Sequence, residues 1–109
     1  MDIENAIKTI TSWYEIENDG IGAYEYWGQK CFDTKPDYVT GGVEFYFEFG
    51  DVKFIKQIFE EDENFEDEII NEFYDNAYGE DIEIEDINFI DKKGVSCIQI
   101  IYVANVPRD

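Results

Sequence analysis

The sequence predicts an α+β fold, in which an antiparallel or mixed sheet of about four to five strands carries two packed helices. Its 109 residues match the commonest size of one domain. Hydrophobic residues make up 44% and aromatic residues 17% of the chain, enough to build a core despite the high charge. Apolar residues recur with helical spacing in some segments and with a period of two in others. We therefore expect residues 1–109 to form one acidic domain.

The first helix is predicted over residues 2–17. Asp2 is a suitable N-cap, and Glu4 lies where the helix dipole favours an acid. The segment Asn18-Asp19-Gly20 supplies the stop signal. Apolar residues recur in this segment at three- and four-residue intervals, namely Ile3, Ala6, Ile7, Ile10, Trp13 and Tyr14.

The next segments read mainly as strands. Ala23–Trp27 is predicted to be a short strand, and Pro36 and the Gly41-Gly42 pair predict a turn region. From Val43 to Phe49, apolar residues alternate with Glu and Tyr, which predicts a strand with one buried face.

Gly50-Asp51 then predicts a turn. Val52–Phe59 is predicted as a further strand, although a helix would satisfy the same apolar positions.

A second helix is predicted to begin at Asn64. Phe65, Ile69 and Phe73 form its apolar stripe, and Gly79 suits the C′ position.

The C-terminal part predicts a β-hairpin. Its first strand, Ile82–Ile90, needs a bulge near Glu85-Asp86 because the apolar alternation changes face there. Asp91–Gly94 forms the predicted turn, and Val95–Ala104 has the apolar character of a central strand covered on both faces. The expected element order is α-β-β-β-α-β-β.

The charge restricts the class of partner. The chain has 27 acidic and 8 basic residues and no His, for a formal net charge of −19. A polyanion of this kind repels nucleic acid and anionic membranes, so its expected partner is a basic protein. No run of 18 apolar residues and no basic, apolar start is present, so we expect neither a membrane span nor a signal peptide. Cys31 and Cys97 do not make a disulfide framework, which favours the cytoplasm, here that of a bacterial host cell.

Several kinds of chemistry are excluded by residue type. Without His, the chain has no Ser-His or Cys-His nucleophile pair and no His-containing metal site. No glycine-rich phosphate-binding motif occurs. The run Asp62-x-Asn64-x-Glu66 resembles the start of a calcium-binding loop, but Asp67 occupies the position that requires Gly. We expect no enzymatic activity, cofactor or metal, although an enzyme that uses carboxylates alone stays formally open.

Acidic residues are concentrated between residues 60 and 86, a segment without Lys or Arg. This segregation favours a partner-binding surface, because a generic surface would interleave basic residues to form i,i+4 ion pairs. The alternatives are a merely solvated face or a halophilic protein whose charge serves solvation. The predicted surface consists of Glu60, Glu61, Asp62, Glu63, Glu66, Asp67, Glu68, Glu72, Asp75, Glu80, Asp81, Glu83 and Glu85, and Asp86 completes the block of fourteen acids.

On the predicted helix, Glu66, Glu68, Glu72 and Asp75 are expected to lie opposite the apolar stripe. Glu83 and Glu85 are expected to project together from one face of the following strand.

An aromatic group, Tyr24, Tyr26, Trp27 and Phe32, has two interpretations. Tyr and Trp dominate the energetics of protein interfaces, so these residues could be partner anchors. Aromatic residues that alternate with acids more commonly pack one face of a strand into the core, which is the interpretation we favour.

In size, charge and lack of catalytic residues, the chain resembles the small acidic phage-encoded inhibitors, namely DNA-mimic anti-restriction proteins and anti-CRISPR proteins. The resemblance covers the composition of the whole chain and rests on no residue motif. It implies an inhibitor that mimics nucleic acid and blocks the basic site of a DNA- or RNA-binding protein, such as a CRISPR or restriction nuclease.

Two alternatives stay open. One is an immunity protein or antitoxin that neutralises a cationic nuclease toxin, and the other is an adaptor domain that self-associates through its aromatic sheet edge. The protein is accordingly expected to be a monomer or a homodimer.

Overall fold

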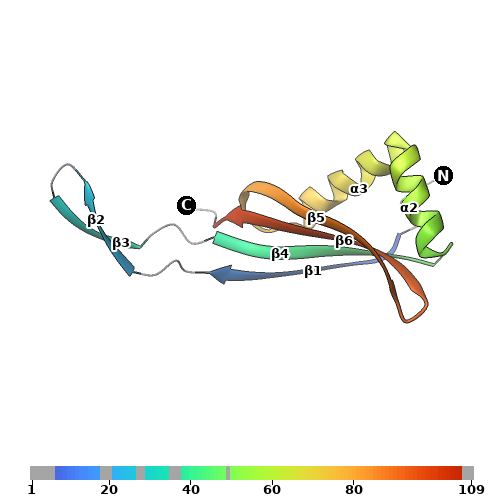
Figure 1. Ribbon diagram of the computed structural model, residues 1–109, viewed down its shortest axis with the longest axis horizontal. Coiled ribbons are helices and arrows are strands. Elements are labelled where there is room, and N and C mark those ends of the chain that lie inside the picture. The colour runs from blue at the N-terminus through green and yellow to red at the C-terminus, as the bar shows by residue number, and fades with distance from the viewer. Residues whose placement is uncertain (1–6, 18–20, 27–28, 35–37, 49, 107–109) are drawn as a thin grey trace.

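The computed structural model of the chain describes residues 7–17, 21–26, 29–34, 38–48 and 50–106, with side chains described in 7–16, 38–48 and 50–106. Four strands form one antiparallel sheet in the order β1-β4-β6-β5, and the two helices among the described residues cover the same face of it (Figure 1). The predicted α+β class is therefore confirmed. The elements are β1 (Ile7–Glu17), β2 (Ile21–Tyr26), β3 (Gln29–Thr34), β4 (Tyr38–Phe47), α2 (Val52–Glu61), α3 (Glu63–Asn76), β5 (Glu80–Lys92) and β6 (Val95–Asn105).

The core lies between this sheet face and the two helices. Each strand places alternate residues on the core face, and each helix buries a stripe spaced by four residues. The fully buried residues include Val43, Phe45 and Phe47 of β4, Ile98 and Ile100 of β6, Ile55 of α2, and Phe65, Ile69 and Phe73 of α3.

The predicted N-terminal helix is wrong, because residues 7–17 form strand β1. A β-bulge between Ile7 and Thr9 places Ile7 opposite Phe47 and Ile10 opposite Phe45. Both isoleucines therefore pack against the core although they are three positions apart, a spacing that a helix also produces. The cap assigned to Asp2 and the stop signal at residues 18–20 lie outside the described residues.

The turn predicted at Gly41-Gly42 is also wrong, because both glycines lie in the interior of β4. A Cβ on Gly41 would stand 2.7 Å from the Tyr102 hydroxyl and 2.7 Å from the Trp13 carbonyl oxygen. Glycine is required there because neighbouring strands approach β4 too closely for a side chain. Pro36 lies outside the described residues.

Val52–Phe59 is helical and not a strand, so the alternative interpretation of this segment holds. Ile55 and Phe59 are buried and four residues apart, as one face of a helix requires. Asp51 fixes the start, since its carboxylate accepts a hydrogen bond of 2.8 Å from the Phe54 amide.

The second predicted helix is confirmed as α3, which buries Phe65, Ile69 and Phe73. The helix ends at Asn76, with Ala77 as its C-cap. The C′ position is therefore Tyr78, so the prediction of Gly79 at C′ is wrong by one residue. Gly79 adopts φ +123° just before β5.

The C-terminal hairpin is confirmed, including the register shift between Ile84 and Asp86. Its turn is tighter than predicted: Lys92 pairs with Val95, so Lys93 and Gly94 alone form the connection, both with positive φ. β6 is a central strand, as expected, but the helices cover only one of its faces (Figure 1). Its other face belongs to what we call the open face of the sheet.

β2 and β3 form a separate two-stranded ribbon that projects from one end of the sheet (Figure 1). The ribbon continues the register of the β1–β4 pair: Glu17 lies opposite Tyr38, and Ile21 lies opposite Thr34. The strand predicted at Ala23–Trp27 is thus confirmed for the part within β2. The side chains of Tyr24, Tyr26 and Phe32, and the whole of Trp27, lie outside the described residues.

Candidate partner-binding surface

The outer side of α3 carries a dense group of carboxylates. The buried stripe Phe65, Ile69 and Phe73 turns the opposite side of the helix outward. Of the four acids predicted to lie opposite that stripe, Glu66, Glu68 and Asp75 are exposed and Glu72 is half-buried. Further exposed acids at the start of the helix are Asp62, Glu63 and Asp67.

Asp62 has a structural role in addition to its charge. Its Oδ1 accepts hydrogen bonds from the backbone amides of Asn64 at 3.0 Å and Phe65 at 3.3 Å. Asp62 is therefore the N-cap of α3 and connects it directly to the end of α2.

Acidic residues also occupy both helix C-termini, where they oppose the helix dipole. Glu60 and Glu61 end α2, and Asp75 lies in the last turn of α3. Neither last turn contains a basic residue. Each such acid faces the negative end of a helix, which disfavours a carboxylate by about 0.3–1 kcal/mol at an exposed position.

The acids of β5 extend this surface around the edge of the sheet. β5 is an edge strand, and Glu80, Asp81, Glu83 and Glu85 are exposed. The register places Glu83 opposite Val103 and Asp86 opposite Ile101, which are residues of the open face.

Glu83 and Glu85 are both exposed, and Ile82 and Ile84, which alternate with them, pack against the core. Glu85 lies at the register shift between Ile84 and Asp86, and the register places Glu83 and Asp86 on the same face. That Glu83 and Glu85 project together stays a prediction. The fourteen acids do not form one flat face, but run from the outer side of α3 around the β5 edge. We call this region the acidic surface and define it by the residues predicted above together with Asp86.

The basic side chains that the structure describes lie outside the acidic surface. Lys8 stands near the start of β1, Lys53 and Lys56 lie in α2, and Lys92 and Lys93 lie at the β5–β6 turn. These segments gather at the end of the sheet that is opposite the β2–β3 ribbon (Figure 1). Within the described residues, the two ion pairs are Lys8–Glu48 at 3.0 Å and Lys92–Glu44 at 2.7 Å. Neither involves the acidic surface.

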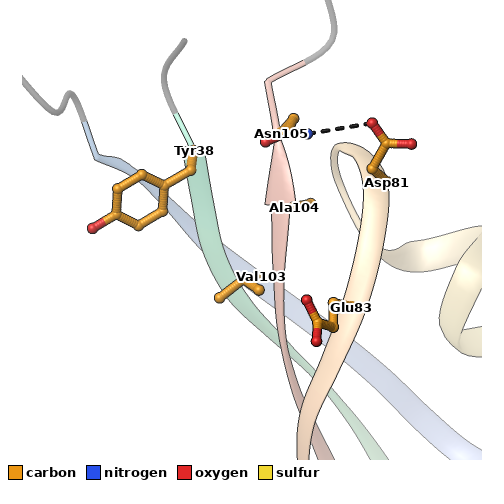
Figure 2. A pocket seen from close by; sticks show the side chains of 6 residues that line it. All are labelled: Tyr38, Asp81, Glu83, Val103, Ala104 and Asn105. Atoms are coloured by element: carbon orange, nitrogen blue, oxygen red, sulfur yellow. Dashed lines mark hydrogen bonds between the residues drawn. The ribbon is translucent and has the colours of Figure 1, made fainter. Parts of the chain in front are cut away.

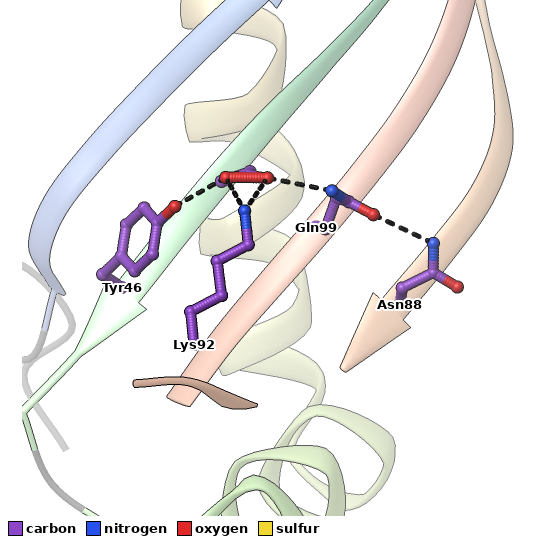
Figure 3. A network of polar contacts seen from close by, with 5 residues as sticks. Tyr46, Asn88, Lys92 and Gln99 are labelled. Atoms are coloured by element: carbon purple, nitrogen blue, oxygen red, sulfur yellow. Dashed lines mark hydrogen bonds and ion pairs between the residues drawn. The ribbon is translucent and has the colours of Figure 1, made fainter. Parts of the chain in front are cut away.

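Glu44 differs from the other acids because it is buried, on the open face of the sheet. Its carboxylate lies at the centre of a polar network whose other members, Tyr46, Lys92, Gln99 and Asn88, are labelled in Figure 3. Lys92 Nζ donates to both oxygens at 2.7 and 2.8 Å, and the Tyr46 hydroxyl donates at 2.6 Å. Gln99 Nε2 donates at 2.9 Å and is itself bonded to Asn88.

Burial would raise the pKa of Glu44, but the hydrogen bonds from Lys92, Tyr46 and Gln99 outweigh this effect and lower it. The carboxylate is therefore ionised and fully engaged inside the protein, which removes it from any partner-binding role. Sequence patterns could not reveal this network, because Glu44 and Lys92 are 48 positions apart.

Two depressions border the acidic surface. Figure 2 shows the first, at the end of the open face nearest the ribbon, where Tyr38, Glu83 and Val103 line a volume of about 460 Å³. Asn105 donates a hydrogen bond of 3.3 Å to Asp81 at its rim. The second lies at the α2–α3 junction and joins the apolar side chains of Phe54 and Ile58 to the acids at 61–63.

No group of three or more potential metal ligands among His, Cys, Asp and Glu occurs within the described residues. Neither described helix has the length and apolar character needed to cross a membrane. Comparison with family models, curated proteins and solved structures finds no match to the chain.

Proposed function

We propose that the acidic surface binds the basic site of a nucleic-acid-handling protein, such as a nuclease, and blocks it in place of the nucleic acid. The observation that carries this proposal is charge segregation. The acids of 60–86 are almost all exposed, and none of them forms an ion pair with another described residue. A surface of this kind attracts Lys- and Arg-lined grooves.

The charge density of α3 supports mimicry of a duplex. The helix has 14 residues and is about 21 Å long. It carries six acids in that length, Glu63, Glu66, Asp67, Glu68, Glu72 and Asp75. B-DNA carries about 12 phosphates over the same distance, roughly half of them on any one side. A basic groove that accommodates a duplex face therefore finds a similar number of negative charges along α3.

The electrostatic cost of this arrangement also supports a binding role. Glu63–Asp67 and Glu68–Glu72 are like-charge pairs at i,i+4, each destabilising by about 0.2–0.5 kcal/mol. The acids at both helix C-termini add to this cost. Solvation needs charge but does not need it at these positions, whereas a cationic partner would relieve the repulsion.

The proposal is tested by competition with DNA. The full-length chain is immobilised and used to capture proteins from a bacterial lysate at low salt, and proteins released by rising salt are identified by mass spectrometry. Each captured protein is then purified, bound to a fluorescent duplex and titrated with the chain. We expect displacement of the duplex at near-stoichiometric concentrations of the chain and a steep loss of binding with salt.

Two double variants with equal net charge make the test specific. Glu68→Lys with Asp75→Lys removes charge from the acidic surface, and Glu15→Lys with Glu48→Lys removes the same charge from exposed positions outside it. We expect the first to weaken displacement at least tenfold more than the second. Equal effects of the two variants, or capture that does not respond to salt, would overturn the proposal.

A further inference from the structure

The two edges of the four-stranded sheet differ in charge. β5 forms one edge and is interrupted by two register shifts. It carries acids along its whole length, from Glu80 to Asp91. Bulges and charges are the usual means by which proteins prevent an edge strand from pairing with another chain. This edge is therefore protected.

β1 forms the other edge and is less protected, because its one register shift lies between Ile7 and Thr9, at the start of the strand, and the pairing with β4 is regular from Thr9 to Glu17. The described side chains of this strand include one basic residue, Lys8, and one acid, Glu15. Among the side chains that the structure describes, six large hydrophobic ones are exposed, and the strand carries three of them, Trp13, Tyr14 and Ile16. The 11 residues of β1 include one Lys and two Glu, so β1 is a weakly charged edge in a chain with a net charge of −19.

We propose that β1 pairs antiparallel with β1 of a second copy, so that the two sheets join into one across a twofold axis. The proposal is independent of the partner-binding function assigned to the acidic surface. A second copy fits this edge because the charges on the strand are self-complementary. With Ser12 on the twofold axis, antiparallel pairing sets Glu15 of one copy opposite Thr9 of the other and therefore next to Lys8, which also pairs with Glu48 of its own chain. Parallel pairing in register would set like charges side by side.

The side chains of the strand also match in such a pairing. With Ser12 on the twofold axis, Thr11 lies opposite Trp13 of the second copy on the open face. Ile10 then lies opposite Tyr14 of the second copy on the helix-covered face. Pairs of an aromatic and a β-branched residue are among the favourable cross-strand combinations in antiparallel sheets. Both faces of the new junction would therefore be stabilised.

The arrangement also separates the acidic surfaces. The joined sheet would have the order β5-β6-β4-β1-β1-β4-β6-β5, with the two acidic β5 strands at its outer edges. Seven spacings of about 4.8 Å place these strands roughly 34 Å apart. That distance is about four Debye lengths at physiological ionic strength. Pairing through β1 thus adds little repulsion between the two acidic surfaces.

A charge-swap cycle tests the pairing on the full chain by sedimentation equilibrium. Lys8→Glu and Glu15→Lys each place like charges at the junction, so each should raise the dimer dissociation constant, on the order of tenfold for two symmetric contacts. The double variant restores opposite charges and should recover most of the affinity. Within one chain, seven residues of strand separate these positions by roughly 23 Å, so their coupling reports a contact between copies.

The matched control combines Glu15→Lys with Lys53→Glu. Lys53 is an exposed lysine of α2, so this double variant has the same net charge but no swap across β1. It should stay as weak as Glu15→Lys alone. Circular dichroism melts of all variants check that folding is retained. A wild-type chain that is monomeric at about 100 μM, or equal affinities of the two double variants, would overturn the pairing.

Salt separates this proposal from the function of the acidic surface. Raising NaCl from about 0.01 to 0.15 M shortens the Debye length from about 30 to 8 Å, which screens repulsion between the copies. Dimerisation should therefore strengthen with salt, whereas binding to a basic partner should weaken. Loss of one behaviour with retention of the other identifies which proposal has failed.

Discussion

The indole ring of Trp13 on β1 lies directly over Gly42 of β4. A Cβ on Gly42 would stand 2.7 Å from Cζ2 of the indole, closer than packed side chains allow. Gly41, its neighbour, faces the opposite side of the sheet, where the Tyr102 ring fills the corresponding space. Aromatic rings from the strands on either side thus cover two glycines in the middle of β4. This packing holds the Gly41-Gly42 pair, whose backbone is intrinsically flexible, in the extended conformation of a central strand.

Substitution of these glycines should reveal which neighbours can move. Gly42→Ala should destabilise the fold by about 1–3 kcal/mol, because the indole must shift. Gly41→Ala should cost more, since its Cβ meets the Trp13 backbone oxygen as well as the Tyr102 hydroxyl.

Urea unfolding of each variant measures these costs. Trp13→Ala should largely rescue Gly42→Ala but not Gly41→Ala, because only the first clash involves the indole side chain. Additive effects of Trp13→Ala and Gly42→Ala would contradict the stacking of the indole on Gly42.

The same contacts explain why the sequence predicts some elements and not others. The β4 alternation and the α3 stripe follow from one dominant period each, so their type is readable from local spacing. Gly41-Gly42 reads as a turn because the rings that cover it come from residues 13 and 102. The Ile7–Ile10 spacing reads as a helix because a bulge imitates the helical interval.

The acidic surface is predictable for a related reason. Exposure of acids on a helix follows from the position of its apolar stripe, so the α3 acids could be assigned correctly. The faces of the β5 acids depend on two register shifts, of which the sequence predicts the one near Glu85-Asp86 but not the one between Glu80 and Glu83. Glu44 could not be distinguished from the other acids, since its burial depends on Lys92 folding across the open face.

Lys92 should control the pKa of Glu44. In the intact protein this pKa lies below its ordinary value of 4.5, so the carboxylate stabilises the fold above that pH, and this contribution is lost as pH falls through the folded-state pKa. In Lys92→Met, burial is opposed only by Tyr46 and Gln99, and the pKa should rise.

The variant should consequently be destabilised most near neutral pH, and its deficit should shrink on acidification. Thermal melts from about pH 7 to about pH 4 measure this trend. Lys93→Met is the matched control, because it removes the same charge from the adjacent turn residue. Lys93 has a φ of 54°, and this positive φ makes the same demand on Met as on Lys. A deficit that is constant across this range would contradict the proposed role of Lys92.

Cys97 should be chemically inert in the folded protein. Its side chain lies on the open face, beside Tyr46, and is buried there. Burial is the larger cause and the nearby Glu44 carboxylate the second cause that raise the pKa of its thiol to about 11. The reactive thiolate is therefore scarce at about pH 8. In a Cys31→Ser background, a thiol reagent should modify Cys97 only as fast as the fold opens, and immediately in denaturant. Rapid native-state labelling would contradict its burial.

Asp62 allows capping to be separated from charge. Asp62→Asn removes the negative charge but keeps an oxygen that can accept from the Asn64 and Phe65 amides. Its stability should stay within about 0.5 kcal/mol of wild type, whereas Asp62→Ala should lose about 1 kcal/mol. Both variants remove the same charge, so they should weaken binding to a basic partner equally. Chemical denaturation and the DNA displacement assay measure the two effects separately.

Asp75 offers the clearest conflict between stability and binding. It is exposed in the last turn of α3, where the helix dipole favours a cation, and it stands three residues after Glu72. Asp75→Lys should therefore stabilise the fold by about 0.3–1 kcal/mol, through the dipole and a new i,i+3 pair with Glu72. The same change should weaken displacement of DNA from a captured basic protein. A substitution that stabilises the fold but weakens binding indicates that the native residue serves the partner and not the fold. A more stable variant that displaces DNA as well as wild type would show that α3 contributes nothing at its C-terminus, and would confine the contact to the α2–α3 junction and β5.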